Sequence, residues 1–482
     1  MYFNSYVFIM LFFPVVLILY FLCNHLKQYT LGKRALLFSS VLFYGWFNDK
    51  AALFIAFISA VNYGIGTYGV KNQKWGKQIK IAGVIFNIGV LGYFKYTNFF
   101  IDTMNQLFSK EIPLLTMWVP IGLSFFTFQQ ICFIVDASKR ELKYSFGDYL
   151  LHSLFFPYII SGPIVRHDQI IPQFNDEGKK QFCVENFQKG IYAFAIGLAE
   201  KVLLADTLAK AVNIGFSDVS SLNSTSAIII TLAYTFQIYF DFSGYSNMVT
   251  GIGKMLNLEM PVNFNSPYRA LSINDFWKRW HISLTKFFTE YVYFPLGGNR
   301  KGKGRTYFNV FMIFFLSGLW HGANWTFIIW GILHGAASVL TRMFHAQWEK
   351  LHTVIKWLAT FSFINITWVF FRAQSVKDAV QIVKYLFSGY YGTLSQELIS
   401  SFIPPEITFI IYQFLNDSAV VQTIFVNLLL ILCLLLSVQA RNVNERLKTF
   451  AQDRQYPVVY AVLFAWAVVS LAGIPTFIYV NF

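Results

Sequence analysis

Apolar runs of roughly 15 to 25 residues recur along this chain, and they constrain its fold more than any other feature. About 20 apolar residues in a helix are enough to cross the hydrocarbon core of a bilayer. Only 13% of the 482 residues are charged, whereas soluble proteins carry about 25%. The sequence therefore predicts an all-α, polytopic transmembrane protein with about 10–12 spans, built as one integrated domain over residues 1–482.

Polar loops divide the apolar runs into expected spans, and other segments are expected to lie at the membrane surface or to re-enter it. Spans are expected at 4–23, 35–48, 51–70, 81–100, 114–137, 190–212, 226–250, 353–371, 419–438 and 457–480. A short apolar segment at 148–162 ends at Gly162–Pro163, and 172–189 is expected to be a loop. The segment 375–388 is expected to be an amphipathic helix on the membrane surface.

Membrane orientation explains the formal net charge of +14, because cytoplasmic loops collect Lys and Arg. Basic loops occur at 27–34, 71–80, 139–143 and 441–454. Pairs of expected spans separate the first three, so these loops share one face, and both termini are expected outside the cytoplasm. The first charge is Lys27, so no basic segment typical of a cleavable signal peptide precedes the first span. Basic residues confined to short loops argue against nucleic-acid binding.

The cysteines point to neither a disulfide framework nor a metal site. Cys23, Cys132 and Cys433 lie in apolar runs, Cys183 lies in a polar segment, and no two form a CxxC pair. We therefore expect no metal ion.

Residues 263–335 differ from the rest of the chain, because aromatic and ionisable side chains alternate there. The residues with this character are Trp277, Trp280, Trp320, Trp325, Trp330, His281, His321, His334, Lys278, Arg279 and Arg300. Ionisable groups beside membrane segments cost free energy, so they indicate a functional site by default. We expect the reaction centre in this stretch.

Within this stretch, one helix is expected over 273–291. Ser272 followed by Asp275 resembles a capping box. At 100° per residue, His281 falls on an aromatic face opposite a charged one. The segment is too charged for a simple span, so it is expected to be interfacial or re-entrant. His281 is interpreted either as a core histidine bonded to the backbone or as a group facing a substrate pocket.

A second histidine, His321, closes an apolar helix expected over 307–319. Gly322 and Asn324 favour a break before a helix that continues to 343. A helix end in the membrane leaves backbone groups free and can border a water-filled cavity. An unperturbed imidazole is largely neutral at pH 7 and can accept a proton from a hydroxyl nucleophile. The sequence leaves open whether His334 faces the same cavity.

Three polar features outside these helices complete the candidate site. Asp241 lies deep in an expected span, either as a structural hydrogen-bond acceptor or as a group that orients a catalytic side chain or a substrate hydroxyl. Glu200 and Lys201 cannot share a helix face, so a partner on another helix is expected. The basic, glycine-rich segment 297–305 is explained either by topology or by attraction of acyl-CoA phosphates. Arg166 is expected at the membrane interface.

Seven segments occur in an order typical of one family. They are VPIGLSFFTFQQ (119–130), FFPYIISGPIVR (155–166), QIYFDFSGYSNM (237–248), FNSPYRALSINDFWKRWHISLTKF (264–287), YFPLGGNRKG (293–302), GLWHGANWTFIIWGILHG (318–335) and WVFFRA (368–373). With these segments the chain resembles the membrane-bound O-acyltransferase (MBOAT) family, in particular its bacterial branch that includes the alginate O-acetyltransferase membrane subunit. The expected catalytic core is 119–373, with peripheral helices at 1–110 and 405–482.

The resemblance implies helices around a central funnel in a bacterial inner membrane. It also implies transfer of an acetyl group from cytoplasmic acetyl-CoA to a hydroxyl of an exported polysaccharide, through a separate extracytoplasmic SGNH-type acyltransferase. Acetyl-CoA is then a donor substrate, and no cofactor is expected to stay bound. Other relatives acetylate peptidoglycan or cellulose, or move D-alanine onto teichoic acid, and no residue here selects the polymer. A non-catalytic transporter or channel is a further alternative, although the sequence shows no internal repeat, and so is a structural subunit whose partner does all the chemistry.

The resemblance also assigns roles to individual residues. His321 matches the family's catalytic histidine, and His281 matches its second important histidine. The residues expected to support the site or to bind substrate are Asp241, Asn324, Trp320, Trp280 and Arg166. The residues expected to recruit the phosphates of the donor are Arg300, Lys301, Lys303 and Arg305.

Overall fold

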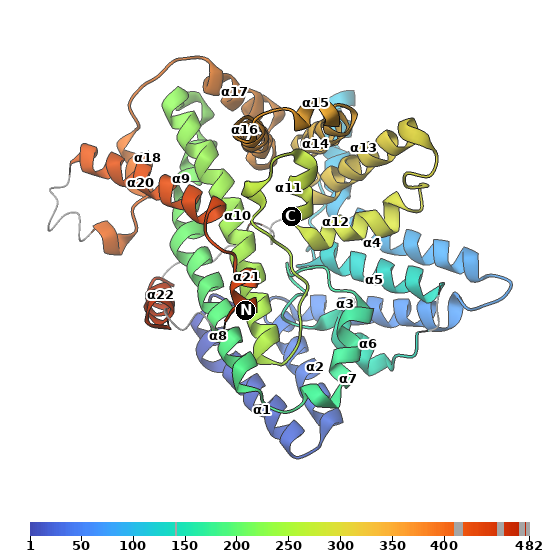
Figure 1. Cartoon of the computed structure of the whole chain (residues 1–482). Helices are drawn as coiled ribbons and strands as arrows, with labels where there is room; N and C mark the ends of the chain where they lie inside the picture. The colour runs from blue at the N-terminus through green and yellow to red at the C-terminus, as the bar shows by residue number, and fades with distance from the viewer. Residues whose placement is uncertain (140–141, 409–417, 451–456, 472–477, 479–482) are drawn as a thin grey trace. The chain divides into compact units, whose positions relative to one another are not determined.

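The computed structural model describes residues 1–139, 142–408, 418–450, 457–471 and 478, and within those residues it is helical without strands (Figure 1). By length and composition, seven described helical segments can cross a membrane: Val7–His25, Asp49–Gly69, Gly76–Phe108, Ser224–Met255, Trp325–Met343, Thr353–Arg372 and Ala419–Val438. The all-α, multi-pass membrane fold is thereby confirmed.

Seven is fewer than the span count expected from the sequence, because some apolar runs form shorter or more highly charged helices. Helix α2 (Tyr29–Gly45) has 17 residues. The expected span at 190–212 is helical, since α8 (Val184–Ala199) continues through a π-helical turn, η4 (Glu200–Ala205), into α9 (Asp206–Ser217). It is not among the seven because it carries the charges of Glu200, Lys201 and Asp206.

The chain divides into two compact units. Unit 1 contains residues 1–195 and 245–262, and unit 2 contains residues 196–244 and 263–470. Helix α8 and the 32-residue helix α10 (Ser224–Met255) contribute residues to both units.

Unit 1 packs its helices around phenylalanine side chains. Its helices are η1 (Val7–Phe12), α1 (Phe13–His25), α2, α3 (Asp49–Gly64), η2 (Ile65–Gly69), α4 (Gly76–Phe108), α5 (Leu123–Ala137), α6 (Phe146–Leu154) and α7 (His167–Asn175). Phe43 lies 6.0 Å from Phe8 and 5.6 Å from Phe156, measured between ring centroids. Contacts pair α1 with α2, α4 with α5, and α6 with both α2 and α3.

Two predictions for unit 1 are wrong in part. The expected span at 114–137 begins only at Leu123, because Gly122 has a φ of +77° and its Cα faces the backbone carbonyls of Ile159 and Ile160. The expected loop at 172–189 is mostly helical, since α7 runs through Pro172 and α8 starts at Val184. A proline in the last turns of such a short helix removes few backbone hydrogen bonds.

Unit 2 contains the stretch that the sequence marks as the reaction centre. Besides α9 and its part of α10, its helices are α11 (Ile273–Arg279), α12 (Ile282–Phe288), η7 (Thr289–Tyr293), α13 (Gly302–His321), α14 (Trp325–Met343), α15 (His345–Glu349), α16 (Thr353–Arg372), α17 (Val376–Phe387), α18 (Gln396–Ser401), α20 (Ala419–Val438), α21 (Val443–Lys448) and α22 (Pro457–Val469). The predicted helices at 353–371, 375–388 and 419–438 are confirmed. The expected last span was 457–480. Its residues after 471, apart from 478, lie outside the described residues.

The predicted single helix at 273–291 is wrong, because two short helices and a π-helical turn replace it. Ser272 does cap the first of them by accepting a hydrogen bond from the backbone N–H of Asp275, as predicted. The break falls at His281, which adopts a left-handed conformation with a φ of +44°.

Candidate functional site

The helical hairpin α13–α14 positions His321, the last residue of α13. Glycines allow the two helices to approach closely. A Cβ atom at Gly318 would lie 2.5 Å from the backbone oxygen of Phe327, and one at Gly331 would lie 2.5 Å from that of Phe314. Asn324 ends the break that was predicted after His321, because it is the N-cap residue of α14.

The hydrogen bond at Nδ1 determines the tautomer of His321. Nδ1 lies 2.7 Å from the backbone oxygen of Ser317, one turn earlier in α13. A carbonyl oxygen can only accept, so Nδ1 carries the proton and Nε2 carries the lone pair of the neutral ring. The imidazole is 2% exposed. His321 therefore has the protonation pattern that a general base acting through Nε2 requires.

Aromatic rings surround His321 on several sides. Trp320, Trp330 and Phe371 lie edge-to-face with the imidazole, at centroid separations of 4.8, 5.0 and 5.1 Å. These contacts hold the ring in one orientation and exclude much of the water around it.

His281 is held by Asn263, a residue that the sequence analysis did not select. Asn263 Oδ1 accepts hydrogen bonds from His281 Nδ1 at 3.1 Å, from Ser283 Oγ at 2.9 Å and from the backbone N–H of Ser283 at 3.3 Å. His281 therefore also donates through Nδ1 and carries its lone pair on Nε2. Its ring lies edge-to-face with that of Phe242, at a centroid separation of 4.8 Å. The ring of Trp320 lies 6.4 Å from it. Trp320 thus contacts both candidate histidines.

His334 uses both ring nitrogens in hydrogen bonds inside the protein. Nδ1 accepts from Trp277 Nε1 at 3.1 Å, so in the neutral ring the proton is on Nε2, which lies 3.0 Å from Thr367 Oγ1. Thr367 in turn donates to the backbone oxygen of Ile364. The sequence left open whether His334 faces the same cavity as His321. Because both of its ring nitrogens are bonded in the core, His334 is a structural group.

Two of the expected supporting residues have clear packing or capping contacts. Trp280 is 1% exposed and packs 5.0 Å from both Phe264 and Trp368. Asn324 accepts a hydrogen bond from the backbone N–H of Thr326 and donates one to the backbone oxygen of Gln374. The structure thus brings Trp320 to the two histidines, whereas the described contacts of Trp280 and Asn324 are with other residues.

Asp241 belongs to a buried ion-pair cluster. Lys201 Nζ lies 2.6 Å from Asp241 Oδ1 and 2.7 Å from Asp206 Oδ1. The expected partner of Lys201 on another helix is therefore confirmed as Asp241 on α10. The close approach of α10 to the end of α8 depends on Gly244, where a Cβ atom would lie 2.7 Å from the backbone oxygen of Gly197. Charges this deep are stable only when paired.

The expected phosphate-recruiting residues lie together at one end of α13. Arg300, Lys301, Lys303 and Arg305 are all exposed. Lys303 and Arg305 belong to the first turn of α13 rather than to a loop. Asn309 holds the preceding turn by donating to the backbone oxygen of Gly298 at 2.9 Å.

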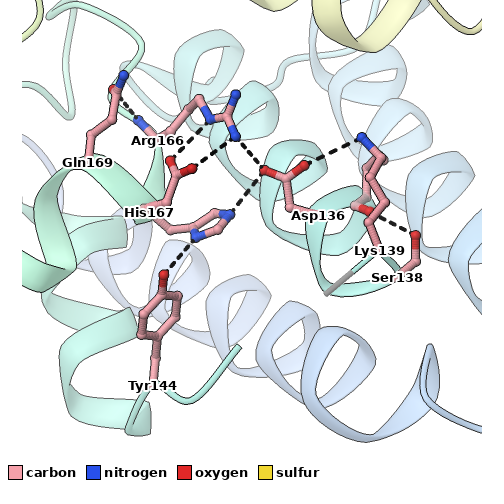
Figure 2. A network of polar contacts seen from close by, with 9 residues as sticks. Asp136, Ser138, Lys139, Tyr144, Arg166, His167 and Gln169 are labelled. Atoms are coloured by element: carbon pink, nitrogen blue, oxygen red, sulfur yellow. Dashed lines mark hydrogen bonds and ion pairs between the residues drawn. The ribbon is translucent and has the colours of Figure 1, made fainter. Parts of the chain in front are cut away.

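Arg166 lies in unit 1, in the polar network of Figure 2. Its guanidinium pairs with Asp168 and, at 3.0 Å, with Asp136 Oδ2 at the end of α5. The same carboxylate lies 3.3 Å from Nε2 of His167, whose Nδ1 lies 3.3 Å from the hydroxyl of Tyr144. The network joins α5, α7 and the segment between α5 and α6, so the described contacts of Arg166 hold unit 1 together.

The roles of Asn263 and of the hairpin glycines were not predicted, because they depend on contacts with residues in other elements. The pattern Gly-Leu-Trp-His followed by a helix with glycines at Gly331 and Gly335 was a usable signal for close helix packing. Among the residues that the structure describes, no group of three His, Cys, Asp or Glu side chains could hold a metal ion.

Comparison with known proteins shows which families and relatives the chain is similar to. Residues 124–377 match the model of MBOAT, the membrane-bound O-acyltransferase family. The chain is 38% identical over 415 residues to the peptidoglycan O-acetyltransferase of Helicobacter pylori, with 79% of each chain covered. It is 38% identical over 407 residues to the probable alginate O-acetylase AlgI of Pseudomonas aeruginosa, which covers 82% of this chain and 76% of that one. The teichoic acid D-alanyltransferase of Bacillus subtilis is 28% identical over 247 residues, with 49% and 62% covered.

Proposed function

Because the chain belongs to the membrane-bound O-acyltransferase family, we propose that it transfers an acetyl group from cytoplasmic acetyl-CoA to a hydroxyl of a cell-envelope polysaccharide. The relatives named as O-acetyltransferases support acetyl as the group transferred, since they match about four fifths of this chain at 38% identity. The D-alanyltransferase matches about half of it at 28%. The peptidoglycan and alginate relatives are each 38% identical to this chain, and both polymers are cell-envelope or exported polysaccharides, which is the acceptor class that we propose.

The hydrogen bond from His321 Nδ1 to Ser317 carries the proposed chemistry. This hydrogen bond leaves the lone pair on Nε2, and Nε2 then removes the proton from the attacking hydroxyl. The hydroxyl oxygen adds to the thioester carbon, and the C–S bond then breaks. The proton held on Nε2 passes to the departing sulfur, so CoA leaves as the thiol and His321 returns to its starting tautomer.

The other predicted residues have supporting roles in this proposal. His281 shares the tautomer of His321 and contacts the same Trp320, so it is suited to orient the hydroxyl or the base. The exposed basic residues at the start of α13 attract the phosphates of CoA. Asp241 and Arg166 each stabilise a polar cluster in their own unit. In the proposed route to the polymer, the attacking hydroxyl belongs to a separate extracytoplasmic acyltransferase of the SGNH type, which then passes the acetyl group on to the polysaccharide.

Substitution of His321 tests the mechanism directly. With protein purified in detergent and radiolabelled acetyl-CoA, we expect His321→Ala to lower thioester cleavage about 10²–10⁴-fold, the usual contribution of general acid–base catalysis. The matched control is His345→Ala, because His345 is exposed at the start of α15. Cells carrying each variant are also assayed for acetyl groups on the envelope polysaccharide. Equal cleavage by the two variants, at equal protein level, would rule out His321 as the base.

A further inference from the structure

The indole of Trp330 is a buried hydrogen-bond donor without an acceptor among the residues that the structure describes. The side chain is 0% exposed, and its Nε1 has no partner. Buried N–H groups in native proteins nearly always have a partner, because leaving one unpaired costs free energy. An exception at a defined position therefore points to a ligand that supplies the acceptor.

Two neighbouring indoles in the same aromatic cluster are satisfied. Trp277 Nε1 donates to His334 at 3.1 Å, and Trp368 Nε1 donates to the hydroxyl of Tyr268 at 3.2 Å. Trp330 packs against Trp368 with its ring nearly parallel, at 5.9 Å. The cluster thus contains acceptors for two indole N–H groups, whereas no acceptor in the described part of the chain faces Trp330 Nε1.

Trp330 also lies beside the candidate base. Its ring centroid is 5.0 Å from that of His321, and the planes meet at 74°. The close approach of α13 and α14 at Gly318 and Gly331 holds both rings in place, because Gly331 directly follows Trp330 in α14. At this separation, one acyl group is large enough to contact both rings.

We propose that Trp330 Nε1–H donates a hydrogen bond to the carbonyl oxygen of the acyl donor, as an electrostatic catalytic group for the reaction proposed above. When the hydroxyl oxygen adds to the thioester carbon, the π electrons of the C=O bond move onto that oxygen. The charged oxygen accepts the indole N–H, and the charge returns to the carbonyl when the C–S bond breaks. A donor of this kind acts most strongly in a site that excludes water, where the N–H needs no reorganisation.

The test replaces the donor atom and keeps the shape of the ring. Incorporation of β-(3-benzothienyl)alanine at position 330 exchanges N–H for sulfur, and Trp330→Phe serves as a second variant. We expect kcat for acetyl-CoA cleavage to fall about 10²–10³-fold, the usual effect of losing one such donor. KM should rise by a smaller factor, because the neutral carbonyl accepts the same hydrogen bond more weakly than the charged oxygen does. The Tm should not fall in the benzothienyl variant, because no protein hydrogen bond is lost.

The matched control makes the same exchange at Trp348, whose Nε1 donates to the backbone oxygen of Leu271 at 2.9 Å. There we expect a lower Tm and an unchanged kcat. A second readout needs no turnover: the affinity for acetonyl-CoA, a ketone that replaces the thioester, should fall with sulfur at 330 and not with sulfur at 348.

The outcomes separate this proposal from the proposed function. A benzothienyl variant at 330 with kcat within about threefold of the wild type, where the donor effect is orders of magnitude larger, overturns the role of Trp330 alone. A wild-type protein that neither cleaves acetyl-CoA nor binds acetonyl-CoA overturns the donor assignment and this proposal with it.

Discussion

At the scale of single residues, the arrangement of the candidate site depends on Asn263. The backbone N–H of Ser283 can only donate, so the atom that faces it at 3.3 Å must be the side-chain oxygen of Asn263. This orientation of the amide requires His281 to donate through Nδ1. It also stabilises the left-handed backbone of His281, which is uncommon for a residue with a Cβ atom. Asn263 is thus a positioning residue for His281.

Removal of this acceptor should therefore misplace His281 more than it unfolds the protein. We expect Asn263→Ala to lower kcat for acetyl-CoA cleavage about 10²-fold, the order of effect caused by misplacing a group by 1 Å. Asn427→Ala is the control, because Asn427 is exposed on α20 and bonds to its own helix. The measurement is kcat per folded protein, with Tm recorded for each variant. A loss of activity that only follows the loss of folded protein would contradict the positioning role.

At the scale of elements, close packing of α13 on α14 positions both His321 and Trp330. Gly318 and Gly331 face each other across the hairpin, and a Cβ atom on either would meet the opposite backbone. Backbone atoms cannot move aside as a flexible side chain can, so any added methyl group must separate the helices. Small residues at such contacts are typical of helices that pack within membranes.

Gly331→Ala should therefore lower both stability and activity. We expect a loss of about 1–3 kcal/mol from overpacking, together with a fall in acetyl-CoA cleavage of about 10²-fold as His321 shifts. Gly89→Ala is a matched control, because a Cβ atom at Gly89 in α4 would meet nothing within 4 Å. There the same substitution should stabilise by up to about 1 kcal/mol, since alanine favours a helix over glycine. Thermal unfolding in detergent and cleavage assays on both variants measure the difference. Equal effects of the two substitutions would contradict the packing argument.

At the scale of the whole molecule, the basic loops determine the orientation that we propose in the membrane. Within unit 1, the end of α3 and the segment after α5 lie together, since the hydroxyl of Tyr63 donates to the backbone oxygen of Tyr144 at 2.8 Å. The basic loop 71–80 follows the end of α3 in the chain, and the basic loop 139–143 directly precedes Tyr144. One membrane face then carries both loops, which favours a cytoplasmic location for them and an extracytoplasmic location for both termini.

Labelling of single cysteines tests this orientation. In a variant with the four native cysteines replaced by serine, Lys74→Cys should react with a membrane-impermeant maleimide only after the cells are permeabilised. Glu111→Cys should react in intact cells, because one expected span separates it from Lys74. Both positions are exposed in the structure, so access to the side chain does not limit the reaction. Labelling of Lys74→Cys in intact cells would reverse the proposed orientation.

Local properties of the sequence determined the helical membrane fold, the helix break after His321 and the N-cap at Ser272. Each of these depends on residues within a few positions of one another, such as an apolar run or a Gly next to an Asn. The resemblance to a known family, rather than these local patterns, selected His321 and His281 from among the buried polar groups.

Only the tertiary structure decided how the histidines differ. His281 is turned out of the expected helix by Asn263, 18 residues away, and His334 is bonded in the core by Thr367, 33 residues away. Arg166 likewise meets Asp136 across 30 residues. The periodicity of apolar residues describes one helix at a time, whereas these contacts join different elements. The free energy of pairing buried polar groups outweighs the local helix preference of each segment.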